Sequence, residues 1–173
     1  MGHASRINSR PERQTGHIVR DSAFGLAPDL LEPVVQLTNR IWTGSSVNPA
    51  LLEMVRLRNA RTVNCTICKA TRYAQAKADG LDENKVGKVA DGYLDSDLSV
   101  REKLALEFTD VYLKNPAGAS PDLLARLRTE FSDAQIADMA VALTTFHAMS
   151  RCAVSLGGLP ESLPVFEMSV PSI

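Results

Sequence analysis

The sequence predicts an all-α protein, and three observations lead to this prediction. From Pro28 onward, apolar residues recur every three or four positions within segments of helical length. Helix-capping residues and glycines mark the ends of these segments. Stretches in which apolar and polar residues alternate, as in a half-exposed β-strand, are scarce.

Length and composition limit the classes of function. The chain has 173 residues, of which 45% are apolar and 23% charged, and this suits one globular domain. The net charge of -1 gives no drive toward nucleic acid, so we expect no nucleic-acid partner. No apolar run approaches the ~18 to 20 residues that cross a bilayer, and no early stretch resembles a secretory signal. We therefore expect a cytoplasmic protein without a membrane partner.

The chain divides into three expected parts. Residues 1–25 carry four arginines and little that could pack, so we expect a mobile or partner-draped arm. Residues 26–160 should form the helical domain. Residues 161–173 contain two prolines and should leave the helical body, lying along the surface or on a neighbouring subunit.

The first two helices are predicted from capping residues and prolines. The first should span residues 29–42, with Pro33 in its first turn or at a kink. Asn48 followed by Pro49 predicts the start of a second helix over residues 49–62. The Asn side chain can accept an unpaired amide there, and proline at the first position loses no needed donor.

The second helix should have an inner face and an outer face. Three of its apolar residues recur at helical spacing and should face the core: Leu51, Leu52 and Val55. Its three arginines should lie largely outside: Arg56, Arg58 and Arg61. Glu53 lies between these two sets.

Two shorter segments follow. A helix over residues 65–79 should end at Gly80, since glycine readily adopts the left-handed conformation that terminates helices. Asp82 can then cap a short helix that runs through Val89.

The next two helices also begin at recognisable caps. Ser99 and Glu102 have the spacing of a capping box, which opens an amphipathic helix over residues 100–115. Ser120 and Pro121 start another short helix.

The longest helix is predicted over residues 133–156. Ser132 and Gln135 repeat the capping-box spacing at its start, and Gly157 with Gly158 ends it. Its apolar residues cover a broad face, which predicts that it is the central helix of a bundle.

Cys65 and Cys68 form the strongest chemical signal in the chain. At i and i+3 they can approach each other in the first turn of a helix, where the amides and the helix dipole stabilise a thiolate. A redox dithiol is one interpretation. Half of a zinc site is a second, although only Cys152 and three histidines remain as further thiol or imidazole ligands. Two packed small residues are the third.

The segments 53–81 and 131–160 together resemble the alkylhydroperoxidase D-like, or carboxymuconolactone decarboxylase, family. The shared features are a Glu on one helix, a CxxC at the next helix start, a Gly-Leu pair after it, and a long last helix. The resemblance covers roughly residues 48–160. It implies an AhpD-like helical bundle that associates into homo-oligomers, commonly trimers or hexamers.

The redox branch of that family has a Glu, a CxxC twelve residues later, and a His four residues after the second Cys. Glu53, Cys65 and Cys68 keep this spacing, whereas Arg72 stands in place of the His. The resemblance implies a thiol-dependent peroxidase that reduces hydroperoxides through a dithiol/disulfide cycle. A separate dithiol would be the reductant, and neither metal nor organic cofactor is needed.

The resemblance also implies roles within the site. Cys68 would be the attacking cysteine, with Cys65 more exposed and open to the reductant, although the helix dipole alone favours Cys65 as the lower-pKa thiol. Glu53 would accept the proton that leaves the thiol. Its alternatives are a solvated helix glutamate and a salt bridge to one of three arginines, which are Arg56, Arg72 and Arg101.

Arg72 and His147 are the supporting candidates. Arg72 cannot relay a proton because guanidinium stays charged, but it could stabilise a thiolate, pair with Glu53, or lie solvated on the surface. His147 is either a core or interface histidine or the imidazole that reaches the CxxC from another helix. Trp42 and Tyr73 should be packing residues.

Three further interpretations complete the prediction. Cys152, within the last helix, should be a buried small hydrophobe. A carboxymuconolactone decarboxylase-like acid-base enzyme is one alternative function, although that chemistry usually relies on histidine. A non-catalytic binding or scaffold protein that keeps the fold is the other.

Overall fold

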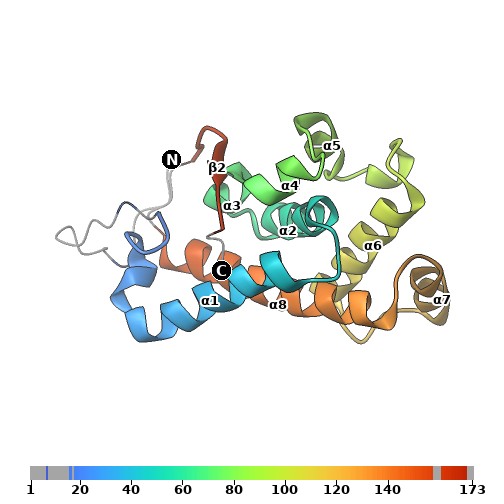
Figure 1. The fold of residues 1–173 in the computed structure, drawn as a ribbon, viewed down its shortest axis with the longest axis horizontal. Helices are drawn as coiled ribbons and strands as arrows, with labels where there is room; N and C mark the ends of the chain where they lie inside the picture. Colours follow the sequence, from blue (N-terminus) through green and yellow to red (C-terminus); the bar gives the residue numbers. More distant parts are fainter. Residues whose placement is uncertain (1–6, 8–15, 17, 158–160, 171–173) are drawn as a thin grey trace.

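The structure is a computed structural model that describes residues 7, 16, 18–157 and 161–170. These residues form eight α-helices, two 3-10 turns and two short strands (Figure 1). The helices are α1 (Pro28–Gly44), α2 (Pro49–Val63), α3 (Thr66–Ala70), α4 (Ala74–Ala78), α5 (Glu83–Lys88), α6 (Val100–Lys114), α7 (Pro121–Glu130) and α8 (Asp133–Leu156). The turns are η1 (Ala23–Leu26) and η2 (Tyr93–Asp95), and the strands are β1 (Thr71–Tyr73) and β2 (Phe166–Met168). The all-α prediction is confirmed, apart from this small sheet.

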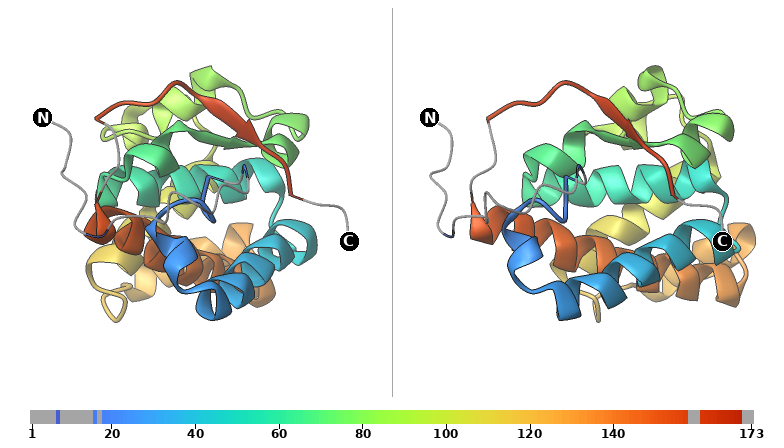
Figure 2. Two further views of the ribbon diagram at one scale, coloured as in Figure 1. Left: turned by 90° about the vertical axis from the view of Figure 1, so that its left-hand side faces the viewer. Right: turned by 60° about the vertical axis from the view of Figure 1, so that its left-hand side comes forward.

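The helices lie in three layers, with α2 enclosed between the other two. Helices α1 and α8 lie on one side of α2, and α3, α4 and α5 lie on the other (Figure 2). Helix α6 packs against the end of α2, and α7 packs on α6. Residues 51–60 of α2 are all buried, whereas α8 leaves Val141 51% exposed. The prediction that the longest helix is central is therefore wrong, because α2 is the helix covered on every side.

Helix α8 also passes a simple test for a membrane span. It is the one helix among the described residues that is long and apolar enough, by length and composition, to cross a bilayer. In the fold it packs against α1, α2 and α6 instead, and its buried residues include Met139, Leu143 and Phe146. These apolar residues of α8 therefore belong to the core of the bundle.

Enclosure of α2 overturns the prediction of an outside position for two of its three arginines, while Arg61 is half-buried. Arg56 is 6% exposed and Arg58 is 8% exposed. Arg58 donates from Nε and Nη2 to Asp110 at 2.7 and 2.8 Å, and from Nη1 to Asp91 at 2.8 Å. The Tyr93 hydroxyl donates to Asp110 as well, and burial followed by the charge of Asp110 raises the pKa of Tyr93. A buried guanidinium is tolerated here because carboxylates pair with it.

Most predicted helix starts are confirmed. Both capping boxes form, at Ser99 with Glu102 and at Ser132 with Gln135. Helix α7 begins at Pro121 with Ser120 as its cap, and Asp82 caps α5, as predicted. Pro33, however, lies beyond the first turn of a continuous α1. Gly157 ends α8, while Gly158 lies outside the described residues.

The start of α2 is capped differently from the prediction. The Asn48 side chain caps no amide of its own helix and donates instead from Nδ2 to Asp79 at 2.8 Å. Asp79 accepts the backbone amide of Ala50 at 2.9 Å. The cap therefore comes from a residue at the end of α4, which ties the two helices together.

Replacing Asp79 by alanine should lower the free energy of unfolding by about 1 kcal/mol, because an unpaired amide is left at the start of α2. Urea unfolding would measure the change. Asp95→Ala, which removes an exposed acid from η2, is the matched control and should change stability by less than about 0.5 kcal/mol. Equal losses in the two variants would contradict the capping role.

The predicted helix over residues 65–79 is divided in two. Helix α3 ends at Ala70, β1 is extended, and α4 begins at Ala74. The buried Arg56 explains the break: it donates to the carbonyl oxygens of Cys68 and Thr71, both at 2.7 Å. A continuous helix would need those carbonyls for its own amides. Gly80 ends α4 with a φ of 90°, as predicted.

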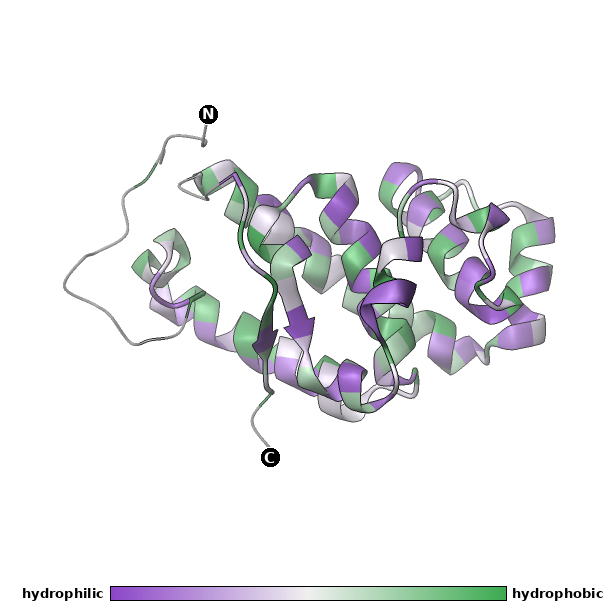
Figure 3. Ribbon diagram, turned by 90° about the horizontal axis from the view of Figure 1, so that it is seen from above, coloured by the Kyte–Doolittle hydropathy of each residue, from purple (hydrophilic) through white to green (hydrophobic). Residues whose placement is uncertain are grey.

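The two ends of the described chain return to the domain. Strand β2 pairs in parallel with β1, with Thr71 opposite Phe166 and Tyr73 opposite Met168 (Figure 3). At the other end, η1 lies against α1 and α8. Most of the predicted arm, residues 1–25, lies outside the described residues, and its boundary with the domain stays a prediction.

Candidate functional site

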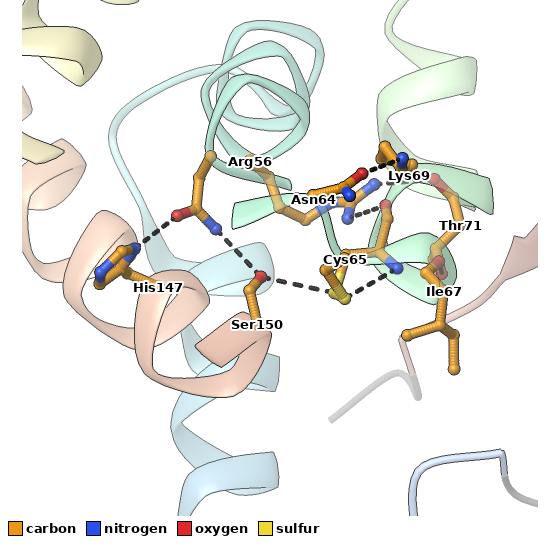
Figure 4. Close-up of a disulfide and its surroundings, with 10 residues drawn as sticks. Arg56, Asn64, Cys65, Ile67, Lys69, Thr71, His147 and Ser150 are labelled. Atoms are coloured by element: carbon orange, nitrogen blue, oxygen red, sulfur yellow. Dashed lines mark hydrogen bonds between the residues drawn. A yellow bond between two sulfur atoms is a disulfide. The ribbon is translucent and has the colours of Figure 1, made fainter. Parts of the chain in front are cut away.

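Cys65 and Cys68 are joined by a disulfide, with their Cα atoms 5.2 Å apart (Figure 4). Asn64 adopts the left-handed conformation that ends α2, so the chain turns and Cys65 becomes the N-cap of α3. The amide of Cys68 donates to Cys65 Sγ at 3.3 Å. The pair therefore has the helix-start geometry that its spacing predicted. Among the described residues, no three His, Cys, Asp or Glu side chains come together as potential metal ligands.

The two sulfurs differ in accessibility, and in the opposite sense to the prediction. Cys65 is 0% exposed because its amide bonds the Ala60 carbonyl and holds it under the end of α2. Cys68 is only partly buried and lines a pocket of about 120 Å³. The expectation that Cys65 is the more exposed cysteine is wrong. A molecule that enters the pocket meets Cys68.

The pocket is walled mainly by apolar side chains from four parts of the chain. These include Val19 and Phe24 near η1, Ile67 of α3, Met149 and Ala153 of α8, and Met168 of β2. The polar groups in its lining include Arg56, Ser150 and Thr71. The backbone near η1 is tightly folded, since a Cβ on Gly25 would clash with the Arg20 carbonyl oxygen.

Glu53 is fully buried and forms a two-pronged ion pair with Arg56. Arg56 Nε lies 2.6 Å from Glu53 Oε2, and Nη2 lies 2.7 Å from Oε1. Burial alone would lower the pKa of Arg56, but the charge of Glu53, the hydrogen bond to Glu53 and the charge of Tyr73 together outweigh it, and the net direction is upward. Of the alternatives for Glu53, the salt bridge to Arg56 is the one that forms. Its role as proton acceptor stays a prediction.

Arg72 turns toward α5. Its Nε and Nη2 donate to Glu83 at 2.7 and 3.0 Å, and Nη1 donates to the Lys69 carbonyl at 2.7 Å. The hydrogen bond from Arg72 lowers the pKa of Glu83. The predicted ion pair between Arg72 and Glu53 is therefore replaced by one to Glu83, because Arg56 already occupies the buried carboxylate.

His147 connects to the cysteine pair through two other side chains. Its Nδ1 lies 2.9 Å from Asn59 Oδ1, Asn59 Nδ2 donates to Ser150 Oγ at 3.1 Å, and Ser150 Oγ donates to Cys68 Sγ at 3.4 Å (Figure 4). Burial, and then the charge of Arg151, lower the pKa of His147. The imidazole thus reaches toward the CxxC from another helix, but without touching sulfur.

Sequence reasoning missed Asn59 and Ser150 as site residues. Ser150 lies three residues after His147 and so shares its face of α8. Asn59 is an uncharged polar residue within the buried run of α2. These two positions could have indicated site residues from the sequence. Neither position predicts a contact with Cys68 unless the packing of α2 against α8 is known.

Three further residues were predicted to pack or to be buried: Trp42, Tyr73 and Cys152. Trp42 is 5% exposed and its ring stacks on Tyr73 at 4.2 Å between centroids, so packing is confirmed for Trp42, whereas Tyr73 both packs on it and lines the pocket. Cys152 is a free, exposed cysteine, and the prediction of burial is wrong. It lies on the outer side of α8, opposite the face that carries Ser150.

No family model matches the chain. Two curated relatives do, the uncharacterized proteins MT2376 and Rv2313c from two strains of Mycobacterium tuberculosis. Each is 36% identical over 115 residues, which is 65% of this chain and 39% of the relative. The chain thus spans about two fifths of the length of these relatives.

A solved structure gives the fold. The crystal structure of ATU0492 from Agrobacterium tumefaciens, a protein of unknown function proposed as the antioxidant defence protein AhpD, superposes with a TM-score of 0.66. The match covers 76% of this chain and 90% of that one, at 22% identity. Together with the helical layers and the CxxC pair, this likeness shows that the chain has the AhpD-like fold.

Proposed function

We propose that the protein is a thiol-dependent peroxidase that reduces hydroperoxides through Cys65 and Cys68. The observation that carries the proposal is the position of Cys68: it lines an apolar pocket and its sulfur is already bonded to a second cysteine at a helix start. The AhpD-like fold adds support at the level of an oxidoreductase. Because the pocket walls are mainly apolar, the substrate is an organic hydroperoxide.

The reaction starts from the reduced pair. The Cys68 thiolate attacks one oxygen of the peroxide, the O–O bond breaks, and the other oxygen leaves with a proton as the alcohol. Cys68 is then a sulfenic acid. The Cys65 thiolate attacks Cys68 Sγ and displaces the hydroxyl, which leaves as water and completes the disulfide. The two thiols supply the two electrons that reduce the peroxide.

The disulfide returns to the dithiol by exchange with an external dithiol. The reductant attacks Cys68, the sulfur that the pocket exposes, and Cys65 leaves as a thiolate. The Cys68 amide, 3.3 Å from Cys65 Sγ, favours that leaving group because it can donate to the charge. The second thiol of the reductant then displaces Cys68.

Arg56 favours the thiolate on Cys68 in this scheme. It is a permanent cation that lines the pocket and donates to the Cys68 carbonyl. Glu53 keeps this guanidinium in place, which gives the Glu a supporting role even where it takes no proton. A cytoplasmic homo-oligomer, without cofactor, nucleic-acid partner or membrane partner, completes the proposal.

One equivalent of cumene hydroperoxide should consume two thiols per chain. The fully reduced protein has three cysteines, so thiol titration after unfolding should fall from three to one. Peptide mapping should find the new disulfide between Cys65 and Cys68. Cumyl alcohol, which lacks the O–O bond, is the control and should leave three thiols.

Failure to lose two thiols would count decisively against the peroxidase. An acid-base enzyme of the carboxymuconolactone decarboxylase type, or a scaffold protein, would then remain. Cys68→Ser separates the peroxidase from both, since neither alternative needs the reactivity of that sulfur.

A further inference from the structure

A line of hydrogen bonds runs from the surface of α8 to the sulfur of Cys68. Arg151 Nη1 lies 3.4 Å from His147 Nε2, and His147 Nδ1 lies 2.9 Å from Asn59 Oδ1. Asn59 Nδ2 then lies 3.1 Å from Ser150 Oγ, which lies 3.4 Å from Cys68 Sγ (Figure 4). Helix α8 supplies Arg151, His147 and Ser150, α2 supplies Asn59, and Cys68 lies in α3.

The chemistry at the two ends fixes the direction of every bond. A guanidinium only donates, so His147 Nε2 accepts from Arg151 and the ring proton lies on Nδ1. The Nδ1–H of His147 donates a hydrogen bond to Asn59 Oδ1, and Asn59 Nδ2 donates in turn to Ser150 Oγ. The Ser150 hydroxyl hydrogen is then directed at Cys68. Because a thiolate only accepts, all the donors point toward the sulfur.

The protonation state of His147 agrees with this direction. Burial and the charge of Arg151 both lower its pKa, so the imidazole is neutral at pH 7 and Nε2 is free to accept. The middle of the line is shielded from water, since Asn59 is 0% exposed and Ser150 is 3% exposed. Water therefore does not compete for these groups, and their bonds hold the hydroxyl in one orientation.

Ser150 differs from the other hydroxyl residues of its helix. Thr144 and Thr145 donate to carbonyl oxygens four residues earlier in α8, which is the usual bond for a hydroxyl within a helix. Ser150 donates to the sulfur of Cys68 on another helix instead. Its hydroxyl is thus directed out of α8 and into the site.

We infer that Ser150 is the hydrogen-bond donor that stabilises the Cys68 thiolate, and that Asn59 and His147 are positioning residues that aim its hydroxyl. This inference rests on the proposed function, because it concerns the attacking thiol of that reaction. It also gives another source for the imidazole that the family motif would supply at position 72. Arg72 stands where the family motif has a histidine and is bound to Glu83, while His147 acts on Cys68 through Asn59 and Ser150.

The test measures the ionisation of Cys68 directly. The reduced protein is alkylated with iodoacetamide across a range of pH, and the modified Cys68 peptide is quantified. Ser150→Ala should raise the pKa of Cys68 by about one unit. At a pH well below that pKa, this shift should slow alkylation about tenfold, because only the thiolate reacts. Ser150→Thr keeps the hydroxyl and should restore most of the rate.

Two controls accompany this variant. Ser155→Ala removes an exposed hydroxyl from the same helix and should leave the Cys68 profile unchanged. Cys152, free and exposed in the same chain, reports alkylation of a thiol outside the site. An unshifted Cys68 profile in Ser150→Ala, or an equal shift in Ser155→Ala, overturns the inference.

The positioning role is tested in two backgrounds. His147→Leu releases the Asn59 amide and should raise the pKa of Cys68 while Ser150 is present. In the Ser150→Ala background, His147→Leu should leave the pKa of Cys68 unchanged, because the hydroxyl that Asn59 and His147 orient is absent. Equal shifts in both backgrounds would mean that His147 acts by charge or by general packing, which overturns its positioning role.

Failure of this inference and failure of the proposed function are distinguishable. Alkylation needs no peroxide, so Ser150→Ala can shift the Cys68 profile in a protein that reduces no hydroperoxide. Conversely, peroxide turnover with an unshifted profile keeps the peroxidase and removes Ser150 from its mechanism. The charged and titratable groups around the pair stay unaltered in the Ser150 variants: Glu53, Arg56, Cys65, Tyr73, His147 and Arg151.

Discussion

Cys68→Ser should lower the rate of hydroperoxide reduction by on the order of 10³-fold or more, to the background of the reductant alone. A serine hydroxyl is not ionised near neutral pH and cannot form the disulfide. Steady-state turnover of cumene hydroperoxide with a dithiol reductant measures the loss. Cys152→Ser, which alters the exposed free cysteine, is the matched control and should keep the wild-type rate.

Cys65→Ser should behave differently from Cys68→Ser. Cys68 can still attack the peroxide once, so one equivalent of alcohol should form rapidly and a sulfenic acid should accumulate on Cys68. Turnover should then stall because no second thiol resolves that acid. The reverse pattern, with the single rapid turnover kept in Cys68→Ser, would make Cys65 the attacking thiol despite its complete burial.

Glu53→Gln should destabilise the fold by about 3 to 5 kcal/mol, because it leaves the guanidinium of Arg56 buried without its counter-charge. Glutamine keeps the shape of the side chain and removes only the charge. Urea unfolding gives the free energy of unfolding, and thiol alkylation on the folded variant shows whether Cys68 has changed.

An exposed ion pair provides the comparison. Lys77 pairs with Glu167 at 3.1 Å on the surface, and Lys77→Gln should cost no more than about 1 kcal/mol. The double variant Glu53→Leu with Arg56→Met should recover much of the loss of Glu53→Gln, since it removes both buried charges. Similar small losses in the free energy of unfolding for Glu53→Gln and Lys77→Gln would show that the charge of Glu53 does not stabilise the fold.

The local rules of helix formation predicted much of the fold. Caps at Ser99, Ser120 and Ser132 depend on a side chain and an amide three residues apart, and such bonds need no information from the rest of the chain. Gly80 ended its helix for the same local reason. Where a cap came from a distant residue, as Asp79 does for Ala50, the prediction failed.

The buried arginines mark the limit of reasoning from periodicity. Charge predicted that Arg56 and Arg58 lie outside, but both are buried: Arg56 pairs with Glu53 one turn earlier in α2, and Arg58 pairs with Asp110 of α6. Arg56 also breaks the helix after the cysteines by taking its carbonyls. A pattern of apolar and polar residues cannot contain that information, because the competing donor comes from another helix.

The sequence by itself determined the all-helical class, most of the helix starts and the cysteine pair at i and i+3, because these depend on bonds between neighbours along the chain. Tertiary structure decided which sulfur is reachable, which partner Glu53 and Arg72 take, and how His147 relates to Cys68. The accessibility of Cys68 and its link to His147 depend on the packing of α2 against α8 and α3. Arg72 takes Glu83 of α5, while Glu53 is buried together with Arg56 of its own helix. Burial within that packing sets the electrostatic environment of the site, and burial is a property of the folded chain alone.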